Sequence, residues 1–246
     1  MCINDMKNKT VLALDCASKT CSVALYKDGK VRCSVDTDTE KTHSLTLLPS
    51  VKAALDLTGS DMSQVDMVAV TAGPGSFTGL KIGVTTAKGL AFSNDLPCAA
   101  VSSMTALAYG CLNFEGLVCP SFDARRSMLY NALFFVSNGK VERLCEDRQS
   151  AASEVAEELK TLASRYGNRV LLAGDGASVL FPLLSDSELS VSCDGSGVKA
   201  SAIITAVISG DCQIKESATL VPDYLRPSQA ERERNERLKN NSSIKE

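Results

Sequence analysis

Residues 68–91, VAVTAGPGSFTGLKIGVTTAKGLA, place an apolar run, a glycine pair and a helical pattern in the order of a nucleotide-binding loop. Gly73 and Gly75 match the start of the dinucleotide fingerprint Gly-x-Gly-x-x-Gly. Thr78 stands where the third glycine belongs, however, and Gly79 comes one residue late. A P-loop needs four residues between its glycines and a lysine after the second, and neither condition is met. The segment therefore favours a strand-to-helix turn whose glycines permit close backbone approach.

The chain has a single histidine, His43, which is the residue type most often used as a general base. A serine nucleophile such as Ser76 would need this base beside it and a carboxylate to orient the base. Ser76 is not part of a Gly-x-Ser-x-Gly elbow, and His43 precedes Ser44 at the start of an expected helix. The pattern favours a histidine at a helix start over a hydrolase.

Ten cysteines are spread along the chain without a Cys-x-x-Cys pair. Because a zinc site needs clustered ligands and only one histidine is present, we expect no metal site. Cys98 and Cys119 lie inside apolar runs, which indicates small buried side chains.

The sequence Asp123-Ala124-Arg125-Arg126 follows an expected strand in the second half of the chain. It can be a polar strand end with its arginines in solvent. It can equally contact an anion or a partner, because a guanidinium binds carboxylate or phosphate through two parallel hydrogen bonds. The sequence leaves both interpretations open.

Composition excludes several classes of protein. The chain of 246 residues is 44% hydrophobic and 5% aromatic, so it can bury a large aliphatic core. Its net charge of −3 argues against a broad nucleic-acid surface, although it leaves room for a local basic patch. We find no secretory signal and no run long enough to span a membrane, and expect a cytoplasmic protein.

The order of elements predicts an α/β fold with an internal duplication. Residues 10–15, 21–26 and 31–37 are expected to form strands, with Asp28-Gly29 as a hairpin turn between the last two. A helix carrying Leu48, a buried strand, the glycine turn and a second helix follow. A looser version of this unit is expected from about residue 117 to 184, beginning with two strands and a third after Asn138-Gly139.

The second helix carries a stripe of tiny side chains every four residues, namely Gly79, Gly83, Ala87 and Ala91. Glycine inside a helix costs up to about 1 kcal/mol relative to alanine, so the stripe requires a compensating contact. Close approach of a helix from a partner protein would compensate. The alternative is that the first helix or the sheet of the same chain fills the groove.

Five motifs occur in order at the spacing of a known family: LALDCASKTCSVAL, HSLTLLP, AVTAGPGSFTGLKIGVTTAKGLA, DARRSMLYNALF and LAGDGA. From about residue 11 to 226 the chain resembles the TsaB (YeaZ) family. The resemblance implies a two-lobed actin-like fold of the ASKHA, ribonuclease H-like type, with mixed sheets flanked by helices. We expect an N-terminal lobe over 1–102, a C-terminal lobe over 103–225 whose last helix packs back on the first lobe, and a charged, flexible tail over 226–246.

The same resemblance implies a subunit without catalytic activity of its own. It would be required for forming tRNA N6-threonylcarbamoyladenosine (t6A) beside the anticodon, pairing with the TsaD transferase and with TsaE. It would reach tRNA through that complex and form a homodimer when alone. The family pairs through its first two helices, so the implied interface residues are Gly79, Gly83, Ala87, Leu48, Val51 and Leu55. The alternative is a stand-alone actin-like ATPase or phosphotransferase, or a glycoprotease-like hydrolase.

The resemblance also implies a degenerate nucleotide site. Actin-like kinases carry Asp-x-Gly-Thr after the first strand, where this chain has Asp15-Cys16-Ala17-Ser18. Cys16 and Ala17 carry side chains where a phosphate-binding backbone favours glycine. The candidate residues are Asp15, Ser18, Gly73, Gly75, Ser76, Asp123 and Arg125. No tightly bound cofactor is expected, and ATP or ADP with magnesium is expected only at the TsaD junction.

Overall fold

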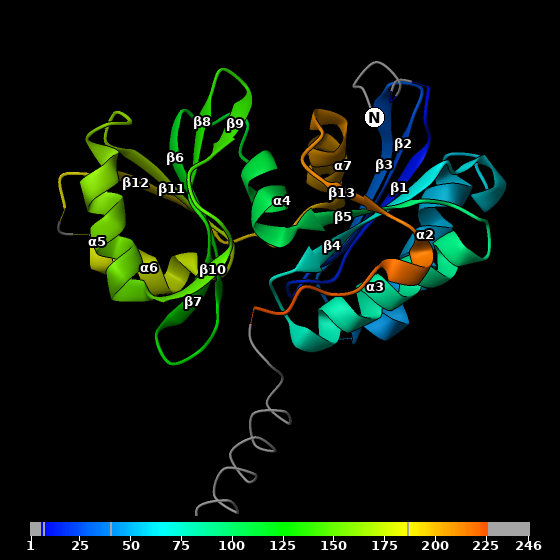
Figure 1. Cartoon of the computed structure of the whole chain (residues 1–246), viewed down its shortest axis with the longest axis horizontal. Coiled ribbons are helices and arrows are strands. Elements are labelled where there is room, and N and C mark those ends of the chain that lie inside the picture. Colours follow the sequence, from blue (N-terminus) through cyan, green and yellow to red (C-terminus); the bar gives the residue numbers. More distant parts are fainter. Residues whose placement is uncertain (1–5, 7, 40, 186, 226–246) are drawn as a thin grey trace, which may run out of the picture.

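The computed structural model describes residues 6, 8–39, 41–185 and 187–225. Figure 1 shows two lobes, each built on a sheet, with short helices between them. The charged tail expected over 226–246 lies outside the described residues.

The sheet of the first lobe has six strands in the order β13-β5-β4-β1-β2-β3. The strands are β1 (Val11–Asp15), β2 (Cys21–Lys27), β3 (Lys30–Thr37), β4 (Met67–Gly73), β5 (Cys98–Ser102) and β13 (Gln213–Lys215). The first three form an antiparallel meander, whereas β1, β4 and β5 run parallel. β1 is buried along its whole length, as a strand covered on both faces must be.

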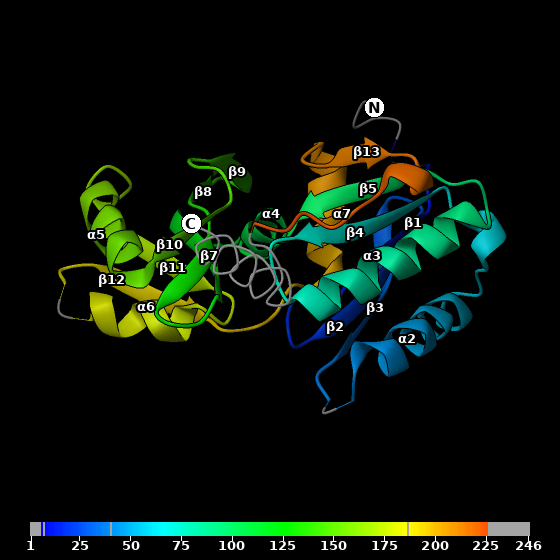
Figure 2. The same ribbon diagram turned by 60° about the horizontal axis from the view of Figure 1, so that its bottom comes forward.

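Alternate residues of β1 belong to different cores, because successive side chains point to opposite faces of a sheet. Leu12 and Leu14 pack with α2 (His43–Leu57) and α3 (Phe77–Phe92). Val11 and Ala13 pack instead with α4 (Ser103–Tyr109) and α7 (Ala200–Ser209). In Figure 2, α2 and α3 lie side by side on one face of the sheet, with α7 on the other.

The sheet of the second lobe repeats part of this plan. Its strands are β6 (Gly116–Asp123), β7 (Met128–Asn131), β8 (Phe134–Ser137), β9 (Lys140–Arg143), β10 (Arg148–Ala151), β11 (Arg169–Ala173) and β12 (Ser190–Asp194). β6 pairs antiparallel with β7 and parallel with β11, just as β1 pairs with β2 and β4. Helices α5 (Ala152–Ala163) and α6 (Ala177–Leu184) cover one face of this sheet. Two single-turn helices, η1 (Met62–Gln64) and η2 (Ser217–Thr219), complete the described elements.

The two lobes share one core, in which residues of both sheets pack around α4 and α7. The expected α/β class and duplication are confirmed: two mixed sheets flanked by helices form two lobes that repeat part of one plan. The chain returns to the first lobe at its C-terminal end, because α7 packs on its sheet and β13 pairs with β5. The expected lobe over 103–225 therefore includes elements that lie in the first sheet.

Some local expectations were wrong. The stretch expected to hold three strands holds β6, β7, β8 and β9, with β10 just after it. Pro49 lies inside α2, at its seventh residue, where proline usually breaks a helix. It is exposed, so the carbonyl of Leu45 that loses its amide donor can be hydrated.

Candidate functional site

A cavity of about 470 Å³ opens between the two lobes at the ends of β1 and β6. Three chain turns and the starts of two helices form its wall. The lining residues are Ala17, Ser18, Lys19, His43, Gly75, Ser76, Phe77, Phe122, Asp123, Arg125, Tyr130 and Asp175.

The structure brings five of the seven candidate nucleotide-site residues together at this cavity: Ser18, Gly75, Ser76, Asp123 and Arg125. The two others, Asp15 and Gly73, are not among its lining residues. A β-carbon on Gly73 would lie 2.2 Å from the carbonyl oxygen of Asp223, and Gly73 lines a separate cavity of about 730 Å³.

Asp15 is fully buried. Its Oδ1 accepts hydrogen bonds from the Thr71 hydroxyl and from the Ala17 amide, the latter at 3.2 Å. Its Oδ2 has no partner among the described residues. Burial raises the pKa of this carboxyl to about 7, against the lowering effect of both hydrogen bonds. Through these hydrogen bonds the buried Asp15 carboxyl holds the β1–β2 turn.

The β1–β2 turn fills the space in front of α3. The Ser76 amide donates to the carbonyl oxygen of Ala17 at 2.8 Å. A β-carbon on Gly75 would lie 2.6 Å from that oxygen, and one on Gly79 would lie 1.9 Å from the carbonyl oxygen of Cys16. The glycine-rich loop therefore accommodates the backbone of its own chain. Carbonyl oxygens also face the helix N-terminus, where a phosphate would need free amide donors.

The expected interface residues fall into two groups. Gly79, Gly83 and Ala87 are buried against the sheet and turn of the same chain, so the alternative explanation of the stripe is correct. Val51 and Leu55 are buried in the same core. These five residues are buried within their own chain. Leu48 is 54% exposed and remains available.

The β6–β7 turn brings Asp123 and Arg125 to the opposite wall of the cavity. The Asp123 carboxylate accepts from the Arg125 amide at 2.7 Å, and the Asp123 amide donates to Asp175 at 2.9 Å. Arg125, Arg126 and Ser127 all have positive φ, a backbone conformation that residues other than glycine adopt at a cost in free energy. Sequence reasoning missed Asp175 as a lining residue, although its Gly-Asp-Gly turn after a strand was a usable signal.

Two cationic side chains, Lys19 and Arg125, line this cavity together with the carboxylates of Asp123 and Asp175. This mixture of charges suits a polar ligand that carries both an anionic group and hydrogen-bond donors.

Close to the cavity, the structure brings together residues that the sequence did not connect. One ligand atom each from Cys16, Cys21 and His43 lies within 4.8 Å of the others. Sequence spacing did not indicate this cluster, because its members come from β2, the β1–β2 turn and the start of α2. The Cys16 thiol donates to Cys21 at 3.9 Å, which lowers the pKa of the Cys21 thiol to about 6 although burial opposes the shift. The same hydrogen bond, together with burial, raises the pKa of Cys16.

Comparisons with known proteins decide the family. A family model described as TsaD, tRNA N6-adenosine threonylcarbamoyltransferase, matches residues 35–234. The tRNA threonylcarbamoyladenosine biosynthesis protein TsaB of Bacillus subtilis (strain 168) is 34% identical over 227 residues, covering 90% of this chain and 96% of that protein. The chain belongs to the TsaB family.

A transferase and a solved structure are similar to this chain at lower sequence identity. The tRNA N6-adenosine threonylcarbamoyltransferase of Ligilactobacillus salivarius (strain UCC118) is 26% identical, and the match covers 82% of this chain but 65% of the transferase. The structure of YeaZ from Pseudomonas aeruginosa superposes with a TM-score of 0.75 at 27% identity, covering 88% of this chain and all of that one.

The expected family and the expected function in tRNA threonylcarbamoyladenosine biosynthesis are thereby confirmed. Across the described residues, none of the helices combines the length and hydropathy that crossing a membrane requires.

Proposed function

We propose that the chain is a subunit without catalytic activity of its own in t6A formation, and that it binds a TsaD-type transferase through the outer faces of α2 and α3. Membership of the TsaB family supports the process. The similarity to TsaD supports a partner of like fold, since related chains commonly pair through equivalent surfaces.

The observation that carries the proposal is the apolar surface of these two helices. Leu45 and Leu48 on α2 are 65% and 54% exposed, and Phe92 at the end of α3 is 75% exposed. A single exposed leucine needs no explanation, whereas several on neighbouring helices are typical of a protein interface. Lys52 on α2 and Lys81 on α3 are exposed and provide polar groups on the same two helices.

Gly89 gives independent support. It lies on the exposed side of α3, and a β-carbon there would meet nothing within 4 Å. Unlike Gly79, it has no contact within its own chain that excludes a side chain. The sequence pattern predicts that a helix of a partner protein approaches the buried stripe closely. We now expect that close approach at Gly89 instead.

The test compares two leucines of similar exposure. Leu48→Asp places a charge on the proposed interface, and Leu183→Asp places one on α6 of the other lobe, where Leu183 is 42% exposed. Titration of each purified variant with the TsaD-type transferase of the same cell should show binding lost for Leu48→Asp and retained for Leu183→Asp, with circular dichroism unchanged for both. Equal affinities for the two variants would refute this interface.

The remaining parts of the proposal concern the assembly. The chain alone forms a homodimer through the same surface, and the transferase displaces the second copy. TsaE and tRNA join through the complex, which acts in the cytoplasm. ATP or ADP with magnesium binds at the transferase junction. The cavity between the lobes of this chain, which Lys19 and Arg125 line, is only a degenerate nucleotide site.

Catalysis by the isolated chain is the alternative. We expect neither ATP hydrolysis nor peptide cleavage at enzymatic rates from the purified chain, because its cavity has no complete phosphate turn and Ser76 has no base paired with it. Turnover that survives repurification and is abolished by Arg125→Ala would establish an enzyme instead.

A further inference from the structure

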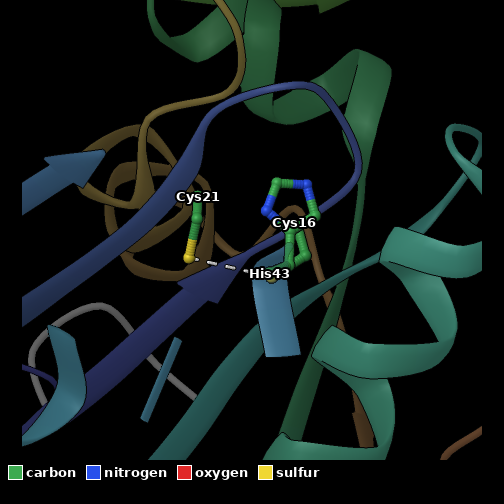
Figure 3. A group of neighbouring side chains, drawn as sticks. All are labelled: Cys16, Cys21 and His43. Atoms are coloured by element: carbon green, nitrogen blue, oxygen red, sulfur yellow. Dashed lines mark hydrogen bonds between the residues drawn. The ribbon is translucent and has the colours of Figure 1, made fainter. Parts of the chain in front are cut away.

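Two thiols and an imidazole meet beneath the β1–β2 turn (Figure 3). Cys16 follows the last residue of β1 and Cys21 begins β2. The register pairs Asp15 with Ser22, so Cys16 and Cys21 form the next facing pair across the hairpin. His43, the first residue of α2, completes the group from a distant part of the sequence.

We propose that these three side chains bind one Zn²⁺ ion. Two thiolates and one imidazole are a donor set that zinc prefers. With Zn–S distances of about 2.3 Å, two sulfurs on a tetrahedral ion lie about 3.8 Å apart, and a sulfur and a nitrogen about 3.5 Å apart. The two Sγ atoms are already 3.9 Å apart. The ring nitrogen lies within 4.8 Å of them, so it needs to approach by at most about 1.3 Å.

The surroundings of the ligands suit a metal. His43 Nε2 lies 2.9 Å from the carbonyl oxygen of Ser18. An N–H donated there fixes the tautomer and leaves Nδ1 with a lone pair, as is usual for histidines that bind metals. The Thr37 hydroxyl donates to the backbone carbonyl of Cys21 at 3.2 Å, which ties the start of β2 to β3. Two thiolates also neutralise the ion, which limits the cost of burying the charges.

The site is reachable from solvent. Both thiols are buried, but His43 is only partly buried and lines two cavities, of about 470 and 510 Å³. The fourth coordination position can therefore be taken by water, as in zinc sites with three protein ligands. A bound ion would join the β1–β2 turn, which packs against the start of α3, to the first residue of α2.

The experiment uses the full-length chain, reduced and stripped with a chelator, and titrated first with Co²⁺ and then with Zn²⁺. Cobalt reports tetrahedral thiolate ligation through its visible absorption, and zinc should displace it. We expect one equivalent bound by the wild type and by two control variants, Cys193→Ser at an exposed thiol and Cys98→Ser at a buried one. Cys16→Ser, Cys21→Ser and His43→Gln should each weaken zinc binding at least about 100-fold.

Two outcomes would overturn the proposal. One is a reduced wild type that binds no zinc at micromolar free zinc concentration. That result would overturn the proposal even if Cys16 and Cys21 can form a disulfide. The other is zinc binding that all three ligand variants retain.

Thermal unfolding keeps the test decisive if a variant is poorly folded. Zinc should raise the unfolding midpoint of the wild type and of Cys193→Ser, because a ligand that binds only the folded state stabilises it. It should not shift the midpoint of Cys16→Ser. Equal shifts for Cys16→Ser and the wild type would place the ion elsewhere.

Discussion

On its inner face α3 carries Gly79 and Gly83, and on its outer face it carries Gly89. The inner pair packs against Cys16 of the β1–β2 turn, whereas the position a β-carbon would take on Gly89 is open. The same residue type thus has different causes on the two faces. On the inner face the fold itself excludes a side chain, and on the outer face nothing in the described chain does.

The largest effect is expected for the tightest inner contact. In Gly79→Ala the new β-carbon would lie 1.9 Å from the carbonyl oxygen of Cys16, which is backbone and cannot rotate away. We expect a loss of more than about 4 kcal/mol in the free energy of unfolding, or failure to fold. Denaturant titration measures it.

The matched control is Gly83→Ala, whose β-carbon would find ordinary contact at 3.4 Å from the β-carbon of Cys16. It should be close to neutral, because alanine also favours the helix by up to about 1 kcal/mol. Equal losses for the two variants would show that the close approach at Gly79 is not what requires glycine.

The turn that contacts the inner face depends on Asp15, whose buried carboxyl has a pKa raised from 3.8 to about 7. The folded state therefore binds a proton more tightly than the unfolded state does. The stability contributed by Asp15 is present below pH 4 and is lost as pH rises toward 7. Relative to Asp15→Asn, the wild type should lose about 2–3 kcal/mol between pH 5 and pH 8.

Denaturant titrations of both proteins at several pH values, with a chelator present, measure this difference. Asp36→Asn is the control, because Asp36 lies nearby on β3 and is exposed. A stability difference between wild type and Asp15→Asn that stays constant across this pH range would contradict the assignment.

A bulky substitution on the inner face of α3 should have an intermediate effect on the free energy of unfolding. In Gly83→Leu the atoms beyond the β-carbon meet Cys16 and Val70, so overpacking should cost about 1–3 kcal/mol and lower the melting temperature. If Gly83→Leu keeps the melting temperature of the wild type but no longer binds the transferase, the stripe of small residues is a partner surface after all.

Sequence patterns predicted the elements of this fold better than its contacts. The hairpin at Asp28-Gly29 depends on neighbouring residues only, and it occurs as expected. β10 and β12 were missed. Both are short, β10 (RQSA) has no apolar side chain that alternates with polar ones, and each is held mainly by its pairing with β7 or β11.

The orientation of the stripe could not be predicted for a related reason. Helical spacing shows that four small residues share a face, but it does not show what that face contacts. Likewise, Cys21 and His43 meet only because the β1–β2 hairpin packs against α2. Sequence spacing carries no trace of such a long-range contact.

The smallest effect is expected on the outer face. Because Gly89 is exposed and open, Gly89→Ala should raise the free energy of unfolding by up to about 1 kcal/mol. Gly89→Leu should leave the isolated chain as stable as the wild type, since a leucine there extends into solvent.

If a partner helix approaches at Gly89, however, the leucine should weaken binding of the TsaD-type transferase at least about tenfold, a loss of about 1.4 kcal/mol. Thr161→Leu adds similar bulk to the exposed face of α5 and should leave binding unchanged. Calorimetry of the three variants measures both quantities. A Gly89→Leu chain that binds with full affinity would leave the glycine of the outer face without a function, and would restrict the proposed interface to α2.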